Sequence, residues 1–396
     1  MGDLRPSDVD VVFREMLGRT PLESEVEIWM RTGSVRALLD GVMESEEYAA
    51  HTARRAAEQA RPAPAAFLNC WVPGWERFAR PTGEISDDGV AIVGNDGHLF
   101  ICGGSNNNVA SFRGIAGVAP GWSQAWRELV QERAEHSRQA GRQLACLVVP
   151  EKLAVYEDLF PGDLTPLARR PVLVLLEEEQ LPLLYPLDEL RQARIGGETY
   201  LRTDSHLTLR GNTLLAGSVL ESLGLSSRLL DDLGSTHSYL APGDLGSHFD
   251  PPILELMQSS AVLSRAAVIS DNRAQVAAVN GHVGTMRVFR NESSPDARVM
   301  VLFGDSYAFG DDAYQGLSWF LAQVFREVHF VWVPFGWDPD YLNDVKADVV
   351  VCQTAERFAG RVPMLRVDAR AMARETVARR APLTEGRIFD DAPRGS

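Results

Sequence analysis

The sequence contains no long uninterrupted apolar run. A membrane-spanning helix needs roughly 18 or more consecutive apolar residues, and no window of this chain of 396 residues approaches that length. Its first residues, MGDLRPSDVDVVF, also lack the basic start and apolar core of an export signal. We therefore expect no membrane span. We expect a cytoplasmic location for the chain as given, or a periplasmic one if an export signal has been removed.

Cysteine is scarce and scattered, with four residues at Cys70, Cys102, Cys146 and Cys352. Three of them stand among apolar residues, so we expect buried free thiols rather than disulfides. Apart from His206, the histidines have no spacing typical of metal ligands. We therefore expect neither a metal nor a cofactor.

Positive charge is also in short supply. Lysine and arginine together number 39 against 54 acidic residues, which gives a net charge of −15. Nucleic-acid binders normally carry a basic stripe, so this class of protein is excluded. Hydrophobic residues make up 45% of the chain, which is enough for a full core in one or two domains.

Apolar runs of strand length alternate with helical patterns after residue 80. This alternation predicts an α/β domain with a mostly parallel sheet flanked by helices, over residues 80–380. Apolar residues at helical spacing predict a separate small helical module over residues 1–50. Residues 51–79 are rich in alanine, arginine and glutamate and are interpreted as a helical connector, and residues 381–396 as a poorly ordered tail.

The stretch ARVMVLFGDSYAFG, from Ala297 to Gly310, is the first candidate for chemistry. Its run Val299–Phe303 has no polar member, which predicts a strand buried on both faces of a parallel sheet. The run stops at Gly304-Asp305-Ser306, and apolar residues at helical spacing follow. Ser306 would then lie between a strand end and a helix N-terminus. There, backbone N–H groups, including its own, can hold an oxyanion.

A second stretch, YLRTDSHLTLRG, offers partners for Ser306. A serine hydroxyl is a weak nucleophile near neutral pH and needs a base, and the base needs an orienting group on its other nitrogen. His206 and Asp204, two residues apart, have the chemistry for these two roles. The alternatives are a structural histidine at position 206 and a helix-capping serine at position 306.

Three further residues are candidates for substrate binding. Tyr307 follows the serine directly. Asn106 and Asn107 belong to the segment GGSNNN from Gly103, which either lines a sugar site or forms a plain turn. The nearby tripeptide Asn95-Asp96-Gly97 separates two apolar runs, which predicts a β-hairpin.

Several landmarks occur in one order along the main domain. They are Val93-Gly-Asn-Asp-Gly97-His-Leu-Phe100, Pro150-Glu-Lys152 with Tyr156, Asp204-Ser-His206-Leu-Thr208 with Gly211, Gly304-Asp-Ser306, and Asp348-Val-Val-Val-Cys-Gln353 with Glu356-Arg357. In this order they resemble the alginate O-acetyltransferase family of SGNH-hydrolase-like proteins, of the AlgX and AlgJ type, over roughly residues 80–365. The resemblance implies an SGNH-hydrolase-like fold.

The resemblance also implies a function. Ser306 would be the nucleophile, His206 the general base and Asp204 the residue that orients it, in an enzyme that transfers an acetyl group to a carbohydrate hydroxyl through an acyl-serine. Two alternatives remain open: a carbohydrate acetylesterase with the same triad, and a non-catalytic glycan-binding or scaffold protein. The chain departs from the family pattern at His98 and Leu207, where tryptophan is usual.

The first fifty residues carry a second resemblance. Phe13, Leu17-Gly18-Arg19, Pro21, Trp29 and Ser45-Glu-Glu-Tyr48 follow the pattern of a short helical domain of unknown function, found in bacterial surface and glycan-modifying proteins. The resemblance implies a docking role and a possible protein partner. The alternative is a plain three-helix bundle.

Overall fold

The computed structural model describes residues 4–48 and 80–378. Within these ranges it leaves out positions 18, 35–36, 39–40, 43–44, 46, 115–116, 167, 178–180, 234–235, 261–264, 278–281 and 311–314. The expected connector (51–79), the expected tail (381–396) and Cys70 lie outside the described residues.

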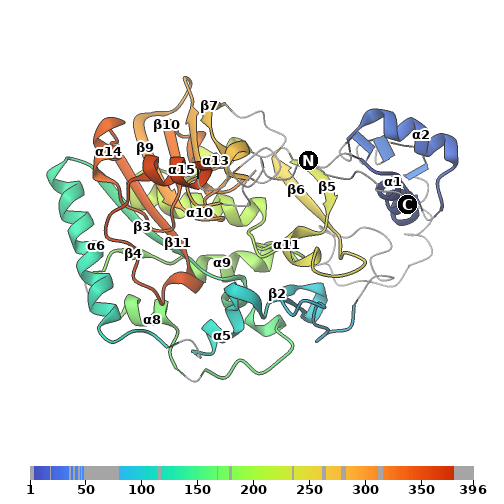
Figure 1. Ribbon diagram of the computed structural model, residues 1–396, viewed down its shortest axis with the longest axis horizontal. Helices are drawn as coiled ribbons and strands as arrows, with labels where there is room; N and C mark the ends of the chain where they lie inside the picture. Colours follow the sequence, from blue (N-terminus) through green and yellow to red (C-terminus); the bar gives the residue numbers. More distant parts are fainter. Residues whose placement is uncertain are drawn as a thin grey trace, which may run out of the picture.

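A mixed sheet forms the centre of the main domain (Figure 1). Among the described residues it has seven strands in the order β4-β3-β11-β9-β10-β8-β7. The strands are β3 (Gln143–Val149), β4 (Leu183–Leu184), β7 (Ala267–Asp271), β8 (Met286–Arg290), β9 (Asp296–Gly304), β10 (Phe325–Trp332) and β11 (Val349–Ala355). Pairing is parallel from β4 to β10 and antiparallel only from β10 to β8 and β7. The prediction of a mostly parallel α/β sheet is therefore confirmed.

The inner strands bury both faces. In β9, Met300 and Leu302 belong to one apolar cluster, whereas Val301 and Phe303 belong to another on the opposite face. This is the alternation that a strand imposes. Because neither face meets water, no polar residue interrupts the run, and the sequence signal for this strand is unambiguous.

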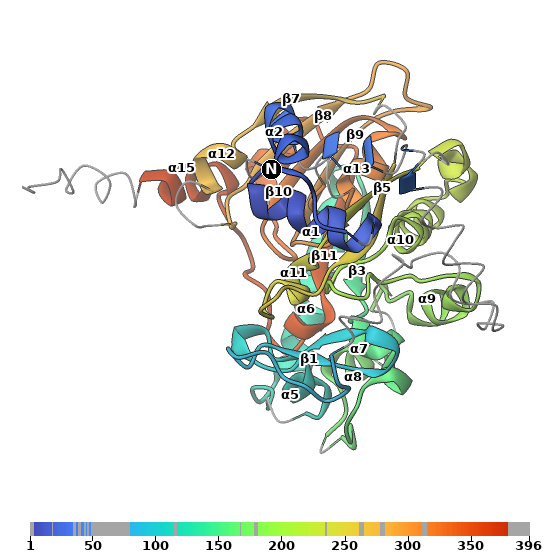
Figure 2. The same ribbon diagram turned by 90° about the vertical axis from the view of Figure 1, so that its right-hand side faces the viewer.

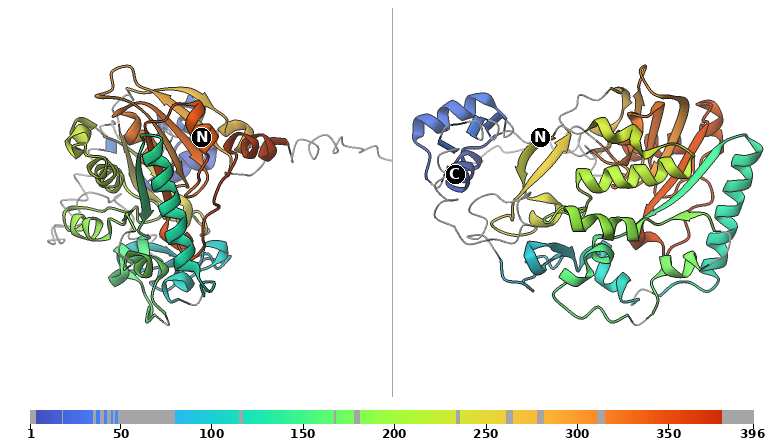
Figure 3. Two further views of the ribbon diagram at one scale, coloured as in Figure 1. Left: turned by 90° about the vertical axis from the view of Figure 1, so that its left-hand side faces the viewer. Right: turned by 180° about the vertical axis from the view of Figure 1, so that it is seen from behind.

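Helices cover both faces of the sheet. The first face carries α5 (Asn108–Phe112), α7 (Lys152–Val155), α9 (Leu187–Ala193), α10 (Leu209–Ser222) and α13 (Leu317–Ala322). The opposite face carries α6 (Trp122–Gln139), α8 (Pro171–Leu176), α14 (Pro339–Asp344) and α15 (Ala369–Ala378). In the left view of Figure 3, α9 and α10 lie on one side of the sheet and α15 lies on the other. The short helix α12 (Arg273–Ala277) follows β7.

Two hairpins flank the sheet. The predicted hairpin around Asn95-Asp96-Gly97 is confirmed, with β1 (Ala91–Val93) antiparallel to β2 (Leu99–Ile101). The second hairpin pairs β5 (Thr236–Ala241) with β6 (Glu255–Ser260), and α11 (Gly243–Gly246) lies in the connection between them. Short 3₁₀ turns complete the list: η3 (Asn95–Gly97), η4 (Gly104–Asn106), η5 (Glu157–Leu159), η6 (Arg194–Gly196), η7 (Ser227–Leu233) and η8 (Glu356–Phe358).

The N-terminal residues form helices α1 (Pro6–Leu17) and α2 (Glu23–Thr32). Val9, Val12 and Phe13 of α1 pack with Leu38 and Val42 in a small apolar cluster of their own. Tyr239, Leu240 and Leu256 of the β5–β6 hairpin pack against this cluster. Figure 2 shows α1 and α2 in front of the main domain, on the side of β5.

Arg19 explains part of the N-terminal sequence pattern. Its guanidinium binds the carboxylates of Glu25 and Glu47, at 2.7 Å and 2.5 Å, and lies over the ring of Phe13. One side chain therefore connects three separate parts of the module.

The helix predicted after Ser306 forms as α13, which contains Leu317, Phe320 and Leu321, but the placement of Ser306 at its N-terminus is wrong. Residues 306–308 form a turn, and the next helix, α13, begins only at Leu317. The reason lies in the hydrogen bonds: the carbonyls of Tyr307 and Ala308 accept from the N–H groups of Leu317 and Ser318 instead of continuing a helix.

Candidate active site

The candidate site lies at the carboxyl end of the sheet. Three adjacent parallel strands, β3, β11 and β9, end there and are followed directly by polar residues. These are Glu151 and Lys152 after β3, Glu356 and Arg357 after β11, and Asp305 and Ser306 after β9. Ligands of open α/β sheets bind at this edge, so the topology gathers these residues where a site is expected.

The turn that carries Ser306 is built by Asp305. Its N–H donates to Gln353 Oε1 and its carboxylate accepts from Gln353 Nε2, both at 2.9 Å. The same carboxylate accepts the N–H groups of Ala355 at 2.7 Å and of Tyr307 at 3.1 Å. Asp305 is fully buried, and this burial raises its pKa. It is therefore the residue that fixes the turn.

Ser306 itself is half-buried at the top of this turn. No described residue makes a hydrogen bond with its hydroxyl or its N–H group. Its N–H is therefore available to an incoming oxyanion as far as the described residues are concerned. Catalytic hydrogen bonds often form only when substrate binds.

His206 and Asp204 form a close pair. Asp204 Oδ1 lies 2.6 Å from His206 Nδ1 and also accepts the His206 backbone N–H at 2.8 Å. The second oxygen of Asp204 accepts the N–H of Asp244 at 2.8 Å. Because Nδ1 faces a carboxylate, it carries the proton, and Nε2 is left as the nitrogen that can act as a base.

The two groups shift each other's pKa. Burial opposes the charged imidazolium, but the charge of Asp204 and its hydrogen bond outweigh burial and raise the pKa of His206 to about 9. Burial also works against the Asp204 carboxylate. The charge of His206 and the hydrogen bonds prevail there too, and they hold the pKa of Asp204 well below its usual range. The pair is therefore ionised near neutral pH.

Lys152 supports the segment that carries Asp204 and His206. Its ammonium is buried and donates to the carbonyls of Arg202 at 2.7 Å and Asp204 at 3.0 Å. Burial lowers the pKa of Lys152 to about 8. Tyr156, four residues along, accepts the N–H of Thr199 through its hydroxyl at 2.9 Å. The Pro150-Glu-Lys152 segment and Tyr156 thus hold the chain leading to His206.

Tyr307 connects the serine turn to the histidine. Its hydroxyl donates to the carbonyl of Ser205 at 3.0 Å, and its ring centroid lies 5.3 Å from that of His206. The residue that follows Ser306 therefore contacts both His206 and Ser205. The side chain of Tyr307 is fully buried, so in this structure it supports His206 from inside the protein.

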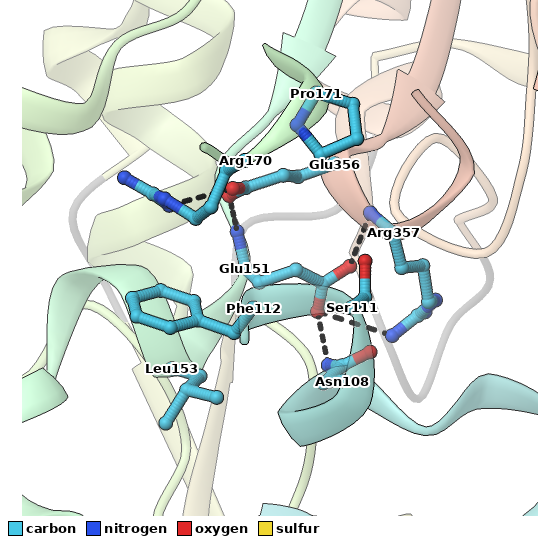
Figure 4. Close-up of a pocket in the computed structure, with 9 residues that line it drawn as sticks. All are labelled: Asn108, Ser111, Phe112, Glu151, Leu153, Arg170, Pro171, Glu356 and Arg357. Carbon is cyan, nitrogen blue, oxygen red and sulfur yellow. Dashed lines mark hydrogen bonds and ion pairs between the residues drawn. The ribbon is translucent and has the colours of Figure 1, made fainter. Parts of the chain in front are cut away.

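A small pocket lies next to Tyr307 (Figure 4). Glu151 lies in it, accepting from Asn108 at 2.6 Å and from Arg357 at 3.1 Å. Glu356 lies beside it and binds Arg170 at 2.6 Å. The Glu151 carboxylate also lies 3.4 Å from the hydroxyl of Tyr307. The two carboxylates of the pocket are thus each paired with an arginine, and one of them, Glu151, contacts the hydroxyl of Tyr307.

The other two predicted site residues are Asn106 and Asn107. Asn107 caps α5, accepting the N–H of Ala110 at 2.8 Å, and Asn106 is exposed. Neither has a hydrogen bond to the 203–206 segment among the described contacts. Its neighbour Asn108, which was not predicted, is the asparagine that reaches the buried acid Glu151.

The two positions that depart from the family pattern are both buried. His98 lies 3.3 Å from Glu198 through Nε2 and stacks on Tyr156, and its burial lowers its pKa to about 4. Leu207 packs in the main core. At both positions the smaller side chain is therefore accommodated inside the protein.

Asp204, His206 and Asp244 also bring ligand atoms within 4.8 Å of one another, so a cation has to be considered. All four oxygens of the two carboxylates already accept hydrogen bonds from Asp244, His206 and Ser205. His206 Nδ1 is committed to Asp204. The geometry therefore favours an acid–base pair over a metal centre.

The cysteine prediction is tested at three of the four positions. Cys146 and Cys352 are buried and free, and Cys102 is free and half-buried. Within the described residues, no helix is both long enough and apolar enough to cross a membrane.

Comparisons with known proteins give structural likenesses only. No family model matches the chain, and no curated protein shows significant sequence similarity to it. The O-acetyltransferase domain of Pseudomonas putida AlgJ matches with 18% identity over 73% of this chain and 99% of that one, at a TM-score of 0.44. Bacillus cereus PatB1 matches with 11% identity over 72% and 99%, at 0.47.

Pseudomonas aeruginosa AlgX matches with 12% identity over 72% of this chain and 65% of that one, at a TM-score of 0.35. AlgJ and AlgX are the proteins whose type the motif order resembles. Likenesses of this degree assign no residue roles, and the chemistry of this chain rests on its own geometry.

Proposed function

We propose that this chain is an O-acetyltransferase that moves an acetyl group to a carbohydrate hydroxyl through an acyl-serine. The observation that supports it best is the half-buried Asp204–His206 pair at 2.6 Å, joined through Tyr307 to the turn of Ser306 at the carboxyl end of the sheet. The acetyl group and the carbohydrate acceptor come from the resemblance of the motif order.

In the proposed reaction, His206 Nε2 removes the proton of Ser306 as the hydroxyl attacks the carbonyl of an acetyl ester. The backbone N–H of Ser306 donates to the oxyanion that forms. His206 then protonates the leaving alcohol, and the acetyl group stays on Ser306. In the second half, His206 deprotonates the acceptor hydroxyl as its oxygen attacks the acetyl carbonyl of the acyl-serine. The bond between the acetyl group and Ser306 Oγ then breaks, and His206 returns the proton to Ser306 Oγ. Asp204 orients the imidazole and stabilises its charge.

The sugar acceptor distinguishes this proposal from the esterase. The test is turnover of p-nitrophenyl acetate with and without a panel of glycan acceptors, with mass spectrometry of the sugars. The proposal predicts acetylated sugar, and less free acetate per p-nitrophenol released as acceptor is added. Acetate in full yield at every acceptor concentration would assign the chain to esterases instead.

The N-terminal module has no place in this chemistry. We propose that residues 1–50 form a docking unit for a protein partner, supported by their own apolar cluster and by the resemblance of the pattern around Arg19.

A further inference from the structure

The acid–base pair is held by a segment about forty residues further along the chain. The connection between β5 and β6 carries Asp244, whose carboxylate accepts the backbone N–H of Ser205 at 2.6 Å and also the Ser205 hydroxyl. Its own N–H donates to Asp204 Oδ2 at 2.8 Å. Asp244 therefore binds both Asp204 and Ser205, the two residues that precede His206.

Asp244 also lies near the imidazole itself. Its Oδ2 is 3.6 Å from His206 Nδ1, on the nitrogen that Asp204 already binds. Among the described residues, the charged or titratable groups that also face His206 include Asp204, Arg357 from η8 after β11, and Tyr307 from the turn after β9. His206 is thus placed between two carboxylates on one side and the Tyr307 ring on another.

The hairpin fits this segment closely. The N–H groups of Leu245 and Gly246 donate to the carbonyl of Thr203 at 3.1 Å and 2.8 Å. Glu255, at the start of β6, accepts from the N–H and hydroxyl of Thr203 at 2.8 Å and 3.0 Å. This carboxylate is buried, and a buried acid that binds both donors of one residue fixes that residue firmly.

At Gly243 the backbone of the β5–β6 connection lies too close to residues 203 and 204 to leave room for a side chain. Its φ is +65°, and a Cβ there would lie 2.4 Å from the carbonyl oxygen of Thr203 and 2.8 Å from the Cβ of Asp204. The backbone of the hairpin connection therefore packs directly on the residues that carry the pair, in a conformation that suits glycine.

We infer that Asp244 is a positioning residue for His206, and that the β5–β6 hairpin is a clamp on residues 203–206. The inference rests on the proposed function, because it assigns Asp244 a role in the acid–base step. Through its charge and its bonds to Ser205 and Asp204, Asp244 holds the imidazole with Nδ1 protonated and Nε2 directed to the substrate. It does not touch the reacting atoms.

The test compares four full-chain variants with the parent protein. Asp244→Asn keeps a side chain that can bond to Ser205 but removes the charge. Asp244→Ala removes both. Asp231→Asn, an exposed acid on η7, is the charge-matched control. Gly243→Ala is a second route to the same effect, since it displaces the clamp and leaves Asp244 intact.

Two readouts are used, and one needs no activity. The first is the NMR titration of the His206 ring, assigned by comparison with His206→Gln. Loss of an opposite charge at this distance is expected to move that titration in Asp244→Asn to lower pH by about one unit. The second is the pH–rate profile for acyl-enzyme formation. We expect its inflection to move with the NMR titration, and its plateau to fall about tenfold in Asp244→Ala and in Gly243→Ala.

The outcomes separate the two proposals. An unchanged His206 titration in both Asp244 variants would overturn the inference, even if activity fell, because a merely structural residue would lower activity without moving the titration. A shift that also appears in Asp231→Asn would overturn it as well. If the parent protein forms no acyl-enzyme, the proposed function fails, and the NMR titration still decides whether Asp244 acts on His206.

Discussion

At the residue scale, the state of His206 controls the proposed chemistry. Its pKa is raised to about 9, because the charge of Asp204 and their hydrogen bond outweigh burial. Only the neutral imidazole can take the serine proton. We predict that the rate of acylation by p-nitrophenyl acetate rises with pH and levels off above about pH 9. The Ser306→Ala protein supplies the background rate, and a flat profile between pH 6 and 9 would contradict the role of His206.

The same raised pKa predicts how stability depends on pH. The ordinary pKa of histidine is about 6.5, so the stabilisation from the charged His206 is fully present below that pH. It is lost as the pH rises through about 9. Asp204 stays ionised across this range because its pKa is lowered. We expect the Tm of the parent to fall more between pH 6.5 and 9.5 than that of His206→Gln, and equal falls would contradict the ion pair.

Gln353 is the residue that pairs with the buried Asp305. Its side-chain amide makes both of the hydrogen bonds between them. A buried polar group that loses its partner costs about 1–3 kcal/mol. We predict that Gln353→Leu lowers the free energy of unfolding by about this amount in urea titration. The exposed Gln139→Leu should change it by no more than about 0.5 kcal/mol. Equal effects would mean that the Asp305 turn does not depend on Gln353.

At the element scale, the junction between β9 and its turn is tightly packed. A Cβ on Gly304 would lie 2.5 Å from the Cβ of Ala308 and 2.6 Å from Gln353 Oε1. We predict that Gly304→Ala displaces the turn and slows acyl-adduct formation at Ser306 by more than about tenfold, while the chain still folds. Gly117→Ala, where nothing lies within 4 Å, is the control. Equal rates in the two variants would show that this junction does not place the serine.

The elements also show what could be predicted from the sequence. Strand β9 was predictable because its burial on both faces leaves a run of apolar residues without interruption. The hairpin of β1 and β2 was predictable because Asn95-Asp96-Gly97 has the chemistry of a turn. The start of the helix after Ser306 was not predictable, because the carbonyls of Tyr307 and Ala308 accept from the N–H groups of residues 317 and 318. Periodicity carries no information on such contacts.

The supporting residues of the site were harder to find. Asp204 and His206 are two positions apart, so a local pattern points to them. Asp244 and Glu255 reach the same segment only because the β5–β6 hairpin folds back on it. Tyr307 was predicted to contact substrate from its place beside the serine, but its burial could not be inferred from sequence position.

At the scale of the whole molecule, the N-terminal module has its own apolar cluster and a contact with the β5–β6 hairpin. Phe13 is buried in that cluster, and truncating such a side chain costs about 3–5 kcal/mol. We predict that Phe13→Ala speeds hydrogen exchange in α1 and α2 and leaves exchange in β9 and β11 unchanged. Equal loss of protection in the central strands would contradict a separate folding unit.

The central claim is that Ser306 carries the acyl group. The most direct measurement is the intact mass of the full chain after brief exposure to p-nitrophenyl acetate, followed by peptide mapping, for the parent, Ser306→Ala and His206→Ala. The account predicts one acetyl adduct in the parent, mapped to Ser306, with none in Ser306→Ala and much slower labelling in His206→Ala. Labelling of all three folded proteins to the same extent, or an adduct on another residue, would contradict it.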